Sequence, residues 1–312
     1  MRTLTLIAGT ANPALAEAVG AQLGVSPCQR EASRFPDGEL HVEIGTSVRG
    51  HDVYLIQPTS PPAEEHLFQL LLLADACRRA GAARLTAIMP YVGYARQDRR
   101  GTGREPVGAR VVADLLATGG LDRVVAVDLH SPALEGVFTV PLEHLSAVKL
   151  LVSALPSLGG AAVVVAPDLG ATKLAERYAR LLDLPVALVH KRRLTGERVT
   201  VRAVTGDVRG RTPLVVDDMI TTGGTIEAAI TALLKEGCAG DIVVTATHGL
   251  FVADAMNRLA ALPIRTLVVT DSVASSAADG LAVRRVGLAP LLAEAIRRLH
   301  EDRSLGDLVV HA

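Results

Sequence analysis

The stretch from Leu214 to Thr225, LVVDDMITTGGT, places two adjacent carboxylates and a run of threonines and glycines between an apolar strand and the start of a helix. Backbone N–H groups and threonine hydroxyls at a helix start form a preferred seat for a phosphate group. Gly223 and Gly224 permit close approach of a ligand and positive φ angles. Asp217 and Asp218 can hold two ribose hydroxyls, or a Mg²⁺ ion bound to them. A plain capped turn, the alternative, does not need so many hydroxyls and glycines.

Positive charge is concentrated in two short segments, although the whole chain has a formal net charge of −1. The first segment holds Arg96, Arg99, Arg100 and Arg104, and the second is Lys191–Arg193. Any attraction for anions is therefore local, and the overall charge favours neither nucleic acid nor a membrane surface as a partner. Because guanidinium binds phosphate through two hydrogen bonds, an arginine-rich loop suits a polyanion. A solvated basic face is the alternative, above all for Arg99 and Arg100.

Seven further motifs follow one another along the chain. They are FPDGE (35–39), YARQDRR (94–100), DRVVAVDLH (122–130), APDLGATKLAERYA (166–179), HKRR (190–193), GDVRG (206–210) and ATHGLF (246–251). Together with residues 214–225 they resemble the ribose-phosphate diphosphokinases, from about residue 2 to residue 272. The resemblance implies an enzyme that transfers the β,γ-diphosphoryl group of Mg-ATP to O1 of ribose 5-phosphate and releases AMP, for nucleotide biosynthesis.

The resemblance implies an ATP site of six residues. They are Phe35, Asp37, Glu39, Arg96, Gln97 and His130. In the family, adenine stacks on the phenylalanine of a neighbouring subunit and acidic residues read its amino edge. A homo-oligomer, at least a dimer, is therefore implied, and a hexamer is expected because family members are often hexamers built from dimers. Phe35 is flanked by Pro36 and Gly38, which favours its display on a loop, although a purely structural turn is the alternative.

Lys191 and Arg193 match the two basic residues of the family's mobile catalytic loop. The implied reaction needs cations there, because ribose O1 attacks the β-phosphorus, AMP leaves and charge builds on the transferred oxygens. A solvated hairpin without a catalytic role is the alternative for this segment. His130 and Asp168 are the implied ligands of the Mg²⁺ cofactor, which takes few protein ligands besides substrate phosphates.

Two loops depart from the family pattern. The implied ribose 5-phosphate contacts are Asp217, Asp218, Thr221, Thr222, Gly223, Gly224 and Thr225. Thr221 stands where many members carry aspartate, which leaves one ribose contact open. Ala171 stands where members commonly carry the second glycine of Pro-Asp-x-Gly-Gly. Because alanine must avoid positive φ, a differently shaped diphosphate loop is expected.

The elements that must position these residues follow a βαβ pattern of short β-branched runs and helical stretches. Strands are predicted at residues 3–8, 52–57, 84–89, 123–127, 162–166, 185–189, 213–216, 242–245 and 265–269. Helices are predicted at residues 13–23, 63–80, 107–118, 146–155, 171–182, 225–236 and 288–300. The two halves echo each other at an offset of about 160 residues, which indicates an internal duplication.

The predicted fold class is α/β, with two doubly wound, mostly parallel sheets of phosphoribosyltransferase type related by that duplication. Residues 1–144 form the predicted N-terminal domain, which carries the ATP and subunit-interface motifs. Residues 145–312 form the predicted C-terminal domain, which carries the ribose 5-phosphate and catalytic loops, and its last helix is a candidate to pack back on the first domain.

Length and composition agree with this organisation. The chain has 312 residues, enough for two domains, and 49% of them are hydrophobic, which argues against disorder. No apolar run reaches the roughly 18 residues of a membrane span, and no targeting segment is evident, so a cytoplasmic protein is expected. Cys28, Cys77 and Cys238 fit neither a disulfide framework nor a zinc site.

Two other functions remain open from the sequence alone. A type I phosphoribosyltransferase would share residues 214–225 but would not need the FPDGE, YARQD or KRR motifs. A non-catalytic regulatory homologue would keep the fold and lose the catalytic loop. Retention of Lys191, Arg193, His130 and the Asp217–Asp218 pair argues against the second alternative.

Overall fold

The computed structural model describes residues 2–193, 199–274 and 281–310, with the side chains of residues 191–202 left outside the description. The chain divides into two compact units. The first unit comprises Met1–Ser146, Ser272–Ala274 and Gly287–Ala312, and the second comprises Ala147–Asp271 and Ser275–Val286. This division places the last helix of the chain in the first unit. Within the described ranges, no helix is long and apolar enough to cross a membrane.

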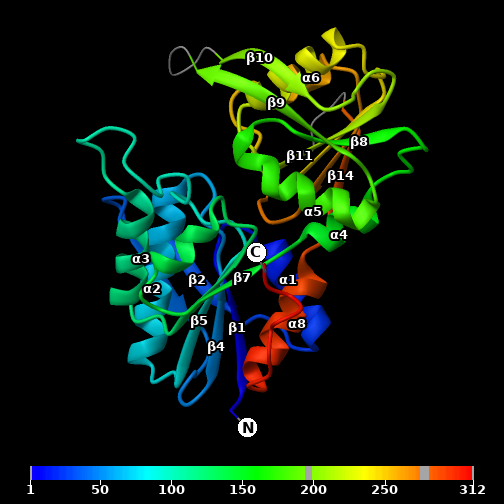
Figure 1. Ribbon diagram of the computed structural model, residues 1–312. Helices are drawn as coiled ribbons and strands as arrows, with labels where there is room; N and C mark the ends of the chain where they lie inside the picture. Colours follow the sequence, from blue (N-terminus) through cyan, green and yellow to red (C-terminus); the bar gives the residue numbers. More distant parts are fainter. Residues whose placement is uncertain (1, 194–198, 275–280, 311–312) are drawn as a thin grey trace. The chain divides into compact units, whose positions relative to one another are not determined.

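The first unit is built on a five-stranded parallel sheet with the order β1-β4-β5-β6-β7. Its strands are β1 Leu4–Ala8, β4 Asp52–Ile56, β5 Arg84–Met89, β6 Arg123–Val127 and β7 Leu142–Leu145. Its helices are α1 Pro13–Leu23, α2 Ala63–Arg79, α3 Gly108–Thr118 and α8 Ala289–His300, with the 3₁₀ turn η1 Pro132–Gly136. Figure 1 shows α2 and α3 on one side of this sheet and α1 and α8 on the other.

Burial on both faces explains the residue types of these strands. Every residue of β4 is buried, as are all residues of β6 after Arg123. A strand covered by helices on both faces reads as a continuous apolar run without alternation. One core cluster packs Leu70 of α2 and Val112 of α3 against strand residues such as Leu55.

The second unit is built on a seven-stranded sheet with the order β10-β9-β8-β11-β12-β13-β14, in which only β10 runs antiparallel to its neighbour. Its strands are β8 Ala162–Ala166, β9 Val186–Arg193, β10 Val199–Thr205, β11 Thr212–Ile220, β12 Ile242–Gly249, β13 Ile264–Thr270 and β14 Val283–Val286. Its helices are α4 Val148–Ala154, α5 Thr172–Leu182, α6 Gly224–Lys235 and α7 Ala255–Ala260, with the 3₁₀ turn η2 Leu169–Ala171.

The two units repeat one order of elements, as the predicted duplication requires. The spatial order β1-β4-β5-β6-β7 corresponds to β8-β11-β12-β13-β14. In each unit an antiparallel strand pair follows the first helix of the repeat: β2 Arg30–Arg34 with β3 Leu40–Ile44, and β9 with β10. The FPDGE and HKRR motifs therefore occupy corresponding hairpins of the two units. The α/β class and the mostly parallel sheets are confirmed.

All the predicted strands and helices are present, with boundaries that differ by up to four residues. The sequence prediction missed β2, β3, β7, β10, β14 and α7. Most of these are short or polar. The strand β2 reads REASR and has no fully buried residue, so it lacks the hydrophobic signal by which a strand is recognised. The prediction also ended β9 and β11 several residues too early, because both strands continue into polar sequence.

A polar cluster fastens α8 to the sheet of the first unit. Asp52, at the start of β4, is fully buried and accepts hydrogen bonds from Arg84 Nε at 2.8 Å and Nη2 at 2.5 Å. His300 Nδ1 lies 2.8 Å from the same carboxylate, and the Tyr54 hydroxyl donates to it at 3.0 Å. Arg84 also donates to the carbonyl of Leu299 at 2.9 Å. The last turn of α8 is thus bound to the first residue of β4.

These contacts set the protonation of Asp52. Burial raises the pKa of a carboxyl group, but the hydrogen bonds from Arg84 and His300, the charge of Arg84 and the hydrogen bond from Tyr54 together outweigh it, so the pKa of Asp52 is lowered. A lowered folded-state pKa gives stability that is present above the ordinary aspartate pKa. That stability is lost as the pH falls through the lowered value.

We predict that Arg84→Met destabilises the protein by about 3 kcal/mol at pH 7, because it leaves a buried carboxylate without its main partner. The matched control is Arg123→Met, at the first residue of the neighbouring strand β6, where the pair with Glu143 is partly exposed. The control should cost about 1 kcal/mol or less. Urea unfolding of both variants measures the difference, and equal losses would contradict the prediction.

Candidate functional site

The candidate phosphate loop joins the end of β11 to the start of α6. Gly223 is the N-cap residue of α6 with φ +76°, and its carbonyl accepts the first helical hydrogen bond, from Glu227 N–H at 2.9 Å. In an α-helix the N–H groups of the first turn point away from the helix body and can meet a ligand. Thr222 is exposed beside them. This arrangement, a helix start at the carboxyl edge of a parallel sheet, is suited to binding a phosphate.

The loop after β12 is hydrogen-bonded to the main chain that leads into the phosphate loop. The N–H groups of Leu250 and Phe251 donate to the carbonyl of Ile220 at 3.0 and 3.2 Å, and that of Val252 donates to the carbonyl of Thr221 at 3.1 Å. Phe251 has φ +46°, an unusual value for a residue with a side chain. The ATHGLF motif pointed to this loop, but its supporting contacts were not predicted.

Three carboxylates gather beside this loop. Burial, the negative charge of Asp218, a hydrogen bond with Asp218 and the charge of Asp168 raise the pKa of Asp217 well above its ordinary value. The Asp218 N–H partly offsets this by donating to Asp217 Oδ1 at 2.9 Å. The site thus concentrates negative charge that a divalent cation, held together with substrate oxygens, would relieve.

Asp168 also shapes the candidate diphosphate loop. Its Oδ1 accepts hydrogen bonds from Gly170 N–H at 3.0 Å and Ala171 N–H at 3.3 Å, so it caps the turn η2 after β8. Ala171 has φ −84°, so the alanine avoids positive φ, as the sequence required. Among the described residues, no three His, Cys, Asp or Glu side chains form a protein-only metal site. Mg²⁺ also takes substrate and water oxygens and needs fewer protein ligands.

The two candidate catalytic residues, Lys191 and Arg193, lie in β9. The main chains of Lys191 and Arg193 pair with Val201 and Val199 of β10. Their side chains, and residues 194–198 between the two strands, lie outside the described part of the chain. The hairpin that carries them is placed at the β10 edge of the second sheet.

The candidate adenine contacts lie on the β2–β3 hairpin of the first unit. Gly38 N–H donates to the carbonyl of Phe35 at 2.8 Å and closes a tight turn. Phe35 is 50% exposed, and its ring meets His41 edge-on with the centroids 5.1 Å apart. Asp37 and Glu39 are exposed on the same turn. Phe35 is thus displayed on a loop, as predicted, while its contact with adenine stays a prediction.

Arg96 and Gln97 follow β5 and are both exposed. Tyr94, just before them, has φ +63°, and its hydroxyl donates to Glu64 at the start of α2. That hydrogen bond, followed by burial and the charge of Glu64, raises the pKa of Tyr94. Gln97 N–H in turn donates to the Tyr94 carbonyl at 2.9 Å, so the turn that presents Arg96 is anchored to α2.

His130 is exposed just beyond the end of β6. Asp128, two residues earlier, is 6% exposed with φ +38°, and its N–H donates to the Leu145 carbonyl of β7 at 2.9 Å. The next N–H, of Leu129, donates to His144 Nε2 at 2.7 Å. The role of His144 was not predicted from the sequence.

The predicted site residues thus fall into two groups. The first unit holds the candidate ATP residues Phe35, Asp37, Glu39, Arg96, Gln97 and His130. The second unit holds Asp168, the positions of Lys191 and Arg193, and the phosphate loop with Asp217, Asp218, Thr221, Thr222, Gly223, Gly224 and Thr225. Within the second unit, Asp168 and the Asp217–Asp218 pair are close enough to affect one another electrostatically.

Comparisons with known proteins cover nearly the whole chain. Residues 4–120 match the family model for the N-terminal domain of ribose phosphate pyrophosphokinase, and residues 195–310 match that of the phosphoribosyl synthetase-associated domain. A ribose-phosphate pyrophosphokinase of Gloeobacter violaceus is 42% identical, over 98% of this chain and 92% of the relative. One of Streptomyces coelicolor is also 42% identical, over 98% and 96% of the two chains. The crystal structure of phosphoribosylpyrophosphate synthetase from Mycobacterium smegmatis matches with a TM-score of 0.89 and 39% identity, over 96% of this chain and all of the other.

We predict that Asp217→Asn raises the thermal midpoint of the ligand-free protein at neutral pH. A raised folded-state pKa means that the ionised Asp217 destabilises the fold above that pKa. This penalty shrinks as the pH falls below the raised pKa and is gone below the ordinary aspartate pKa. The gain should therefore shrink toward acid pH. The control Asp241→Asn, at an exposed pair with Arg265, should shift stability by no more than about 0.5 kcal/mol. Differential scanning fluorimetry across pH provides the test, and a midpoint lowered at neutral pH refutes the assignment.

Proposed function

Because this chain belongs to the ribose-phosphate pyrophosphokinase family, we propose that it transfers the β,γ-diphosphoryl group of ATP to O1 of ribose 5-phosphate. The bond from O1 to the β-phosphorus forms, the bond from the β-phosphorus to the bridging α,β-oxygen breaks so that this oxygen leaves as part of AMP, and the O1 proton passes to solvent. The products are 5-phosphoribosyl 1-diphosphate and AMP, which serve nucleotide biosynthesis in the cytoplasm. The observation that carries this proposal is the phosphate loop at the start of α6 beside three carboxylates, within a chain that is similar to these enzymes throughout.

The second unit is proposed to bind and orient ribose 5-phosphate. The N–H groups of the first turn of α6, with the hydroxyls of Thr222 and Thr225, would hold the 5-phosphate. Asp217 and Asp218 would accept hydrogen bonds from the ribose hydroxyls. These contacts would leave O1 facing the second substrate. Because both substrates are then held in place, their reaction becomes effectively unimolecular.

The first unit is proposed to bind ATP. Phe35 would stack on adenine, with Asp37 and Glu39 accepting from its amino group, and Arg96, Gln97 and His130 would contact the nucleotide.

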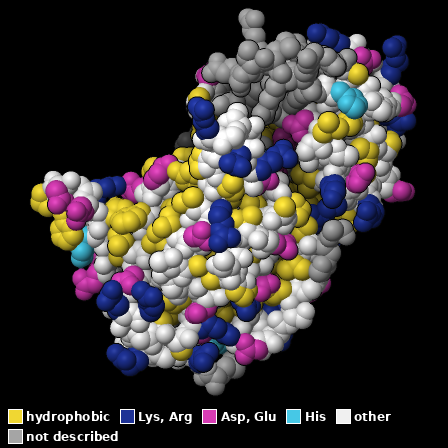
Figure 2. All heavy atoms as spheres, turned by 60° about the vertical axis from the view of Figure 1, so that its left-hand side comes forward, with side chains coloured by type: hydrophobic (Ala, Val, Ile, Leu, Met, Phe, Trp, Pro, Cys, Tyr) yellow, Lys and Arg dark blue, Asp and Glu magenta, His cyan; other side chains and the backbone are white. Residues whose placement is uncertain are grey.

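As in the family, Phe35 would serve the site of a neighbouring subunit, so the enzyme would be a homo-oligomer, at least a dimer, with a hexamer expected. An exposed apolar surface supports self-association: Phe68 of α2 and Val111 and Leu115 of α3 are exposed. Figure 2 shows hydrophobic side chains gathered on the face that includes these helices.

His130 and Asp168 are proposed to hold the Mg²⁺ cofactor, which would neutralise charge on the phosphate oxygens. Lys191 and Arg193 would stabilise the charge that builds on the transferred oxygens. No nucleophilic serine or cysteine is required, because ribose O1 itself attacks phosphorus. The relatives named ribose-phosphate pyrophosphokinase match 98% of the chain, and the comparisons lend no support to the two alternatives considered from the sequence.

The proposal is tested by incubating the protein with Mg²⁺, ATP and ribose 5-phosphate and following phosphorus resonances. We expect AMP and a diphosphorylated ribose 5-phosphate in equal amounts, with none formed when ribose 5-phosphate is omitted. ADP or free diphosphate as the main product would count against the proposal. Removal of the metal with EDTA should abolish turnover, and added Mg²⁺ should restore it.

Replacing Lys191 should lower the rate of the chemical step and leave nucleotide binding nearly unchanged. We expect Lys191→Ala to lower kcat by about 10²-fold or more, because it removes a charge that acts mainly in the transition state. Affinity for a non-hydrolysable ATP analogue, measured by calorimetry, should stay within about twofold. The control Lys235→Ala removes an exposed lysine at the end of α6 and should leave kcat unchanged. A normal kcat in Lys191→Ala removes this residue from the mechanism.

Straining the phosphate loop should weaken one substrate selectively. Gly223 has φ +76°, and an added Cβ would lie 3.3 Å from Leu259 Cγ. We expect Gly223→Ala to raise KM for ribose 5-phosphate about tenfold and to change KM for ATP little. Positive φ costs roughly 1–2 kcal/mol in alanine, so the substitution distorts the phosphate loop. The control is Gly237→Ala, at φ +80° beyond the other end of α6. Equal effects of the two variants on KM would show that Gly223 acts only through stability.

A further inference from the structure

We propose that His144 is a positioning residue for the turn Asp128–His130, and that it sets the place of His130 through the main chain of Leu129. The inference rests on the proposed nucleotide-binding role of this turn. His144 lies in β7 and is 3% exposed, so it reaches no substrate directly. Neither a catalytic role nor packing alone explains a hydrogen bond from its ring to the backbone beside His130.

The turn depends on β7 for two successive hydrogen bonds. Asp128 N–H donates to the Leu145 carbonyl at 2.9 Å, which continues the pairing of β6 with β7. Leu129 N–H donates to His144 Nε2 at 2.7 Å. The imidazole therefore supplies an acceptor at the point where the chain leaves the sheet. Leu129 is itself 8% exposed and packs in the core, so its N–H lies where few other acceptors can reach.

The same ring contacts the far side of the loop. Because Nε2 accepts a hydrogen bond from a backbone N–H, a neutral His144 carries its proton on Nδ1. Nδ1 lies 3.3 Å from Glu135 Oε1, and Glu135 belongs to the turn η1 that follows His130. His144 thus accepts a hydrogen bond from the segment before His130, and its Nδ1 lies within ion-pair distance of Glu135 in the segment after it without forming a hydrogen bond.

Backbone strain at the turn makes such support necessary. Asp128 adopts φ +38°, a conformation that residues with side chains rarely adopt unless their surroundings enforce it. The bonds to Leu145 and His144 restrain this residue on both of its peptide units. Loss of the imidazole acceptor would free the second peptide unit and let the turn relax. His130, the next residue but one, would then move.

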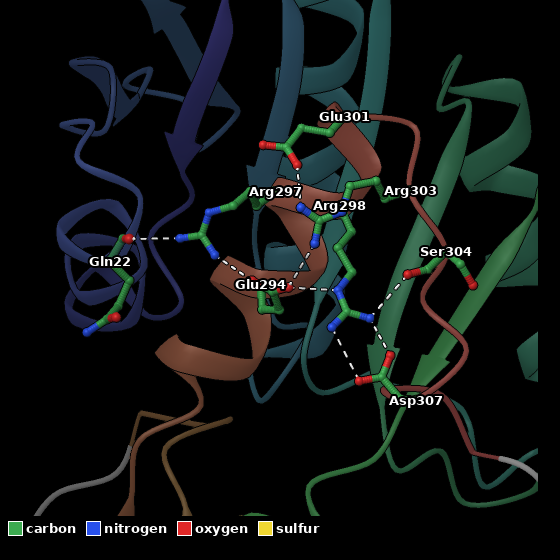
Figure 3. A network of polar contacts seen from close by, with 8 residues as sticks. All are labelled: Gln22, Glu294, Arg297, Arg298, Glu301, Arg303, Ser304 and Asp307. Carbon is green, nitrogen blue, oxygen red and sulfur yellow. Dashed lines mark hydrogen bonds and ion pairs between the residues drawn. The ribbon is translucent and has the colours of Figure 1, made fainter.

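The main chain of β7 around His144 is also hydrogen-bonded to residues 308–310. The His144 carbonyl accepts from Val310 N–H at 2.8 Å, and Ser146 N–H donates to the Leu308 carbonyl at 3.0 Å. The tail is fixed in turn by Arg298 of α8, which pairs with Asp307 and donates to the Ser304 carbonyl at 3.2 Å. Figure 3 shows Arg298 between Glu294 and these two tail residues. The ring of His144 therefore projects from a strand that is fixed along its length.

The test compares His144→Leu, which removes the acceptor at similar size, with His144→Gln, which can return an oxygen acceptor to the turn. In the full-length protein we expect His144→Leu to speed hydrogen–deuterium exchange at the Leu129 amide about tenfold or more, because its partner is lost. Affinity for a non-hydrolysable ATP analogue should fall about tenfold, with KM for ribose 5-phosphate changed less than about twofold. His144→Gln should restore most of both properties.

A control on the same strand separates positioning from stability. Leu142→Ala removes packing from β7 but leaves the Asp128–Leu145 and Leu129–His144 hydrogen bonds in place, so it should lower the thermal midpoint while leaving the exchange at Leu129 and the nucleotide affinity close to wild type. Unchanged exchange or unchanged nucleotide affinity in His144→Leu overturns the proposal, as does an equal effect of Leu142→Ala. If the wild-type protein makes no AMP from ATP and ribose 5-phosphate, the proposed function fails, whereas the exchange and binding results still decide the role of His144.

Discussion

Burial of parallel strands on both faces is the constraint from which the rest of each unit follows. Strands such as β4 and β11 are apolar for most of their length because helices cover the sheet, so exposed polar groups concentrate at and beyond the strand ends. All parallel strands of a sheet end at one edge, and helices begin there. Carboxylates, loop amides and helix starts from separate parts of the sequence are therefore gathered at that edge.

Two opposite electrostatic features meet at that edge in the second unit. The start of α6 favours a negative group, while Asp168, Asp217 and Asp218 favour a positive one. The pKa of Asp217 is raised first by its burial and then by the negative charges of Asp218 and Asp168. A phosphorylated sugar with a divalent cation satisfies both features, which is why the fold tolerates this arrangement at a cost in stability.

The same topology serves a different purpose in the first unit. The loop after β4 corresponds to the phosphate loop after β11, but it carries Pro61 and Pro62, which have no N–H groups to offer a phosphate. Instead of such a phosphate loop, this unit has the β2–β3 hairpin with the exposed Phe35, and turns with positive φ at Tyr94 and Asp128. The two units thus share one strand order and differ in the loops that follow corresponding strands.

The sequence alone determined the α/β class, the buried strands and long helices, and the phosphate loop, because their signals are local: apolar runs, helical periodicity and a glycine-threonine segment between them. It also predicted the display of Phe35 from its neighbours Pro36 and Gly38, and the resemblance to the family singled out Ala171. The β2–β3 hairpin escaped prediction because its polar strands gain their pairing from each other and bury little. Only the tertiary structure decided the lowered pKa of Asp52, the raised pKa of Asp217 and the bond from Leu129 to His144. Each depends on groups brought together from different strands, and the energies of burial and charge that govern them exist only once the chain has folded.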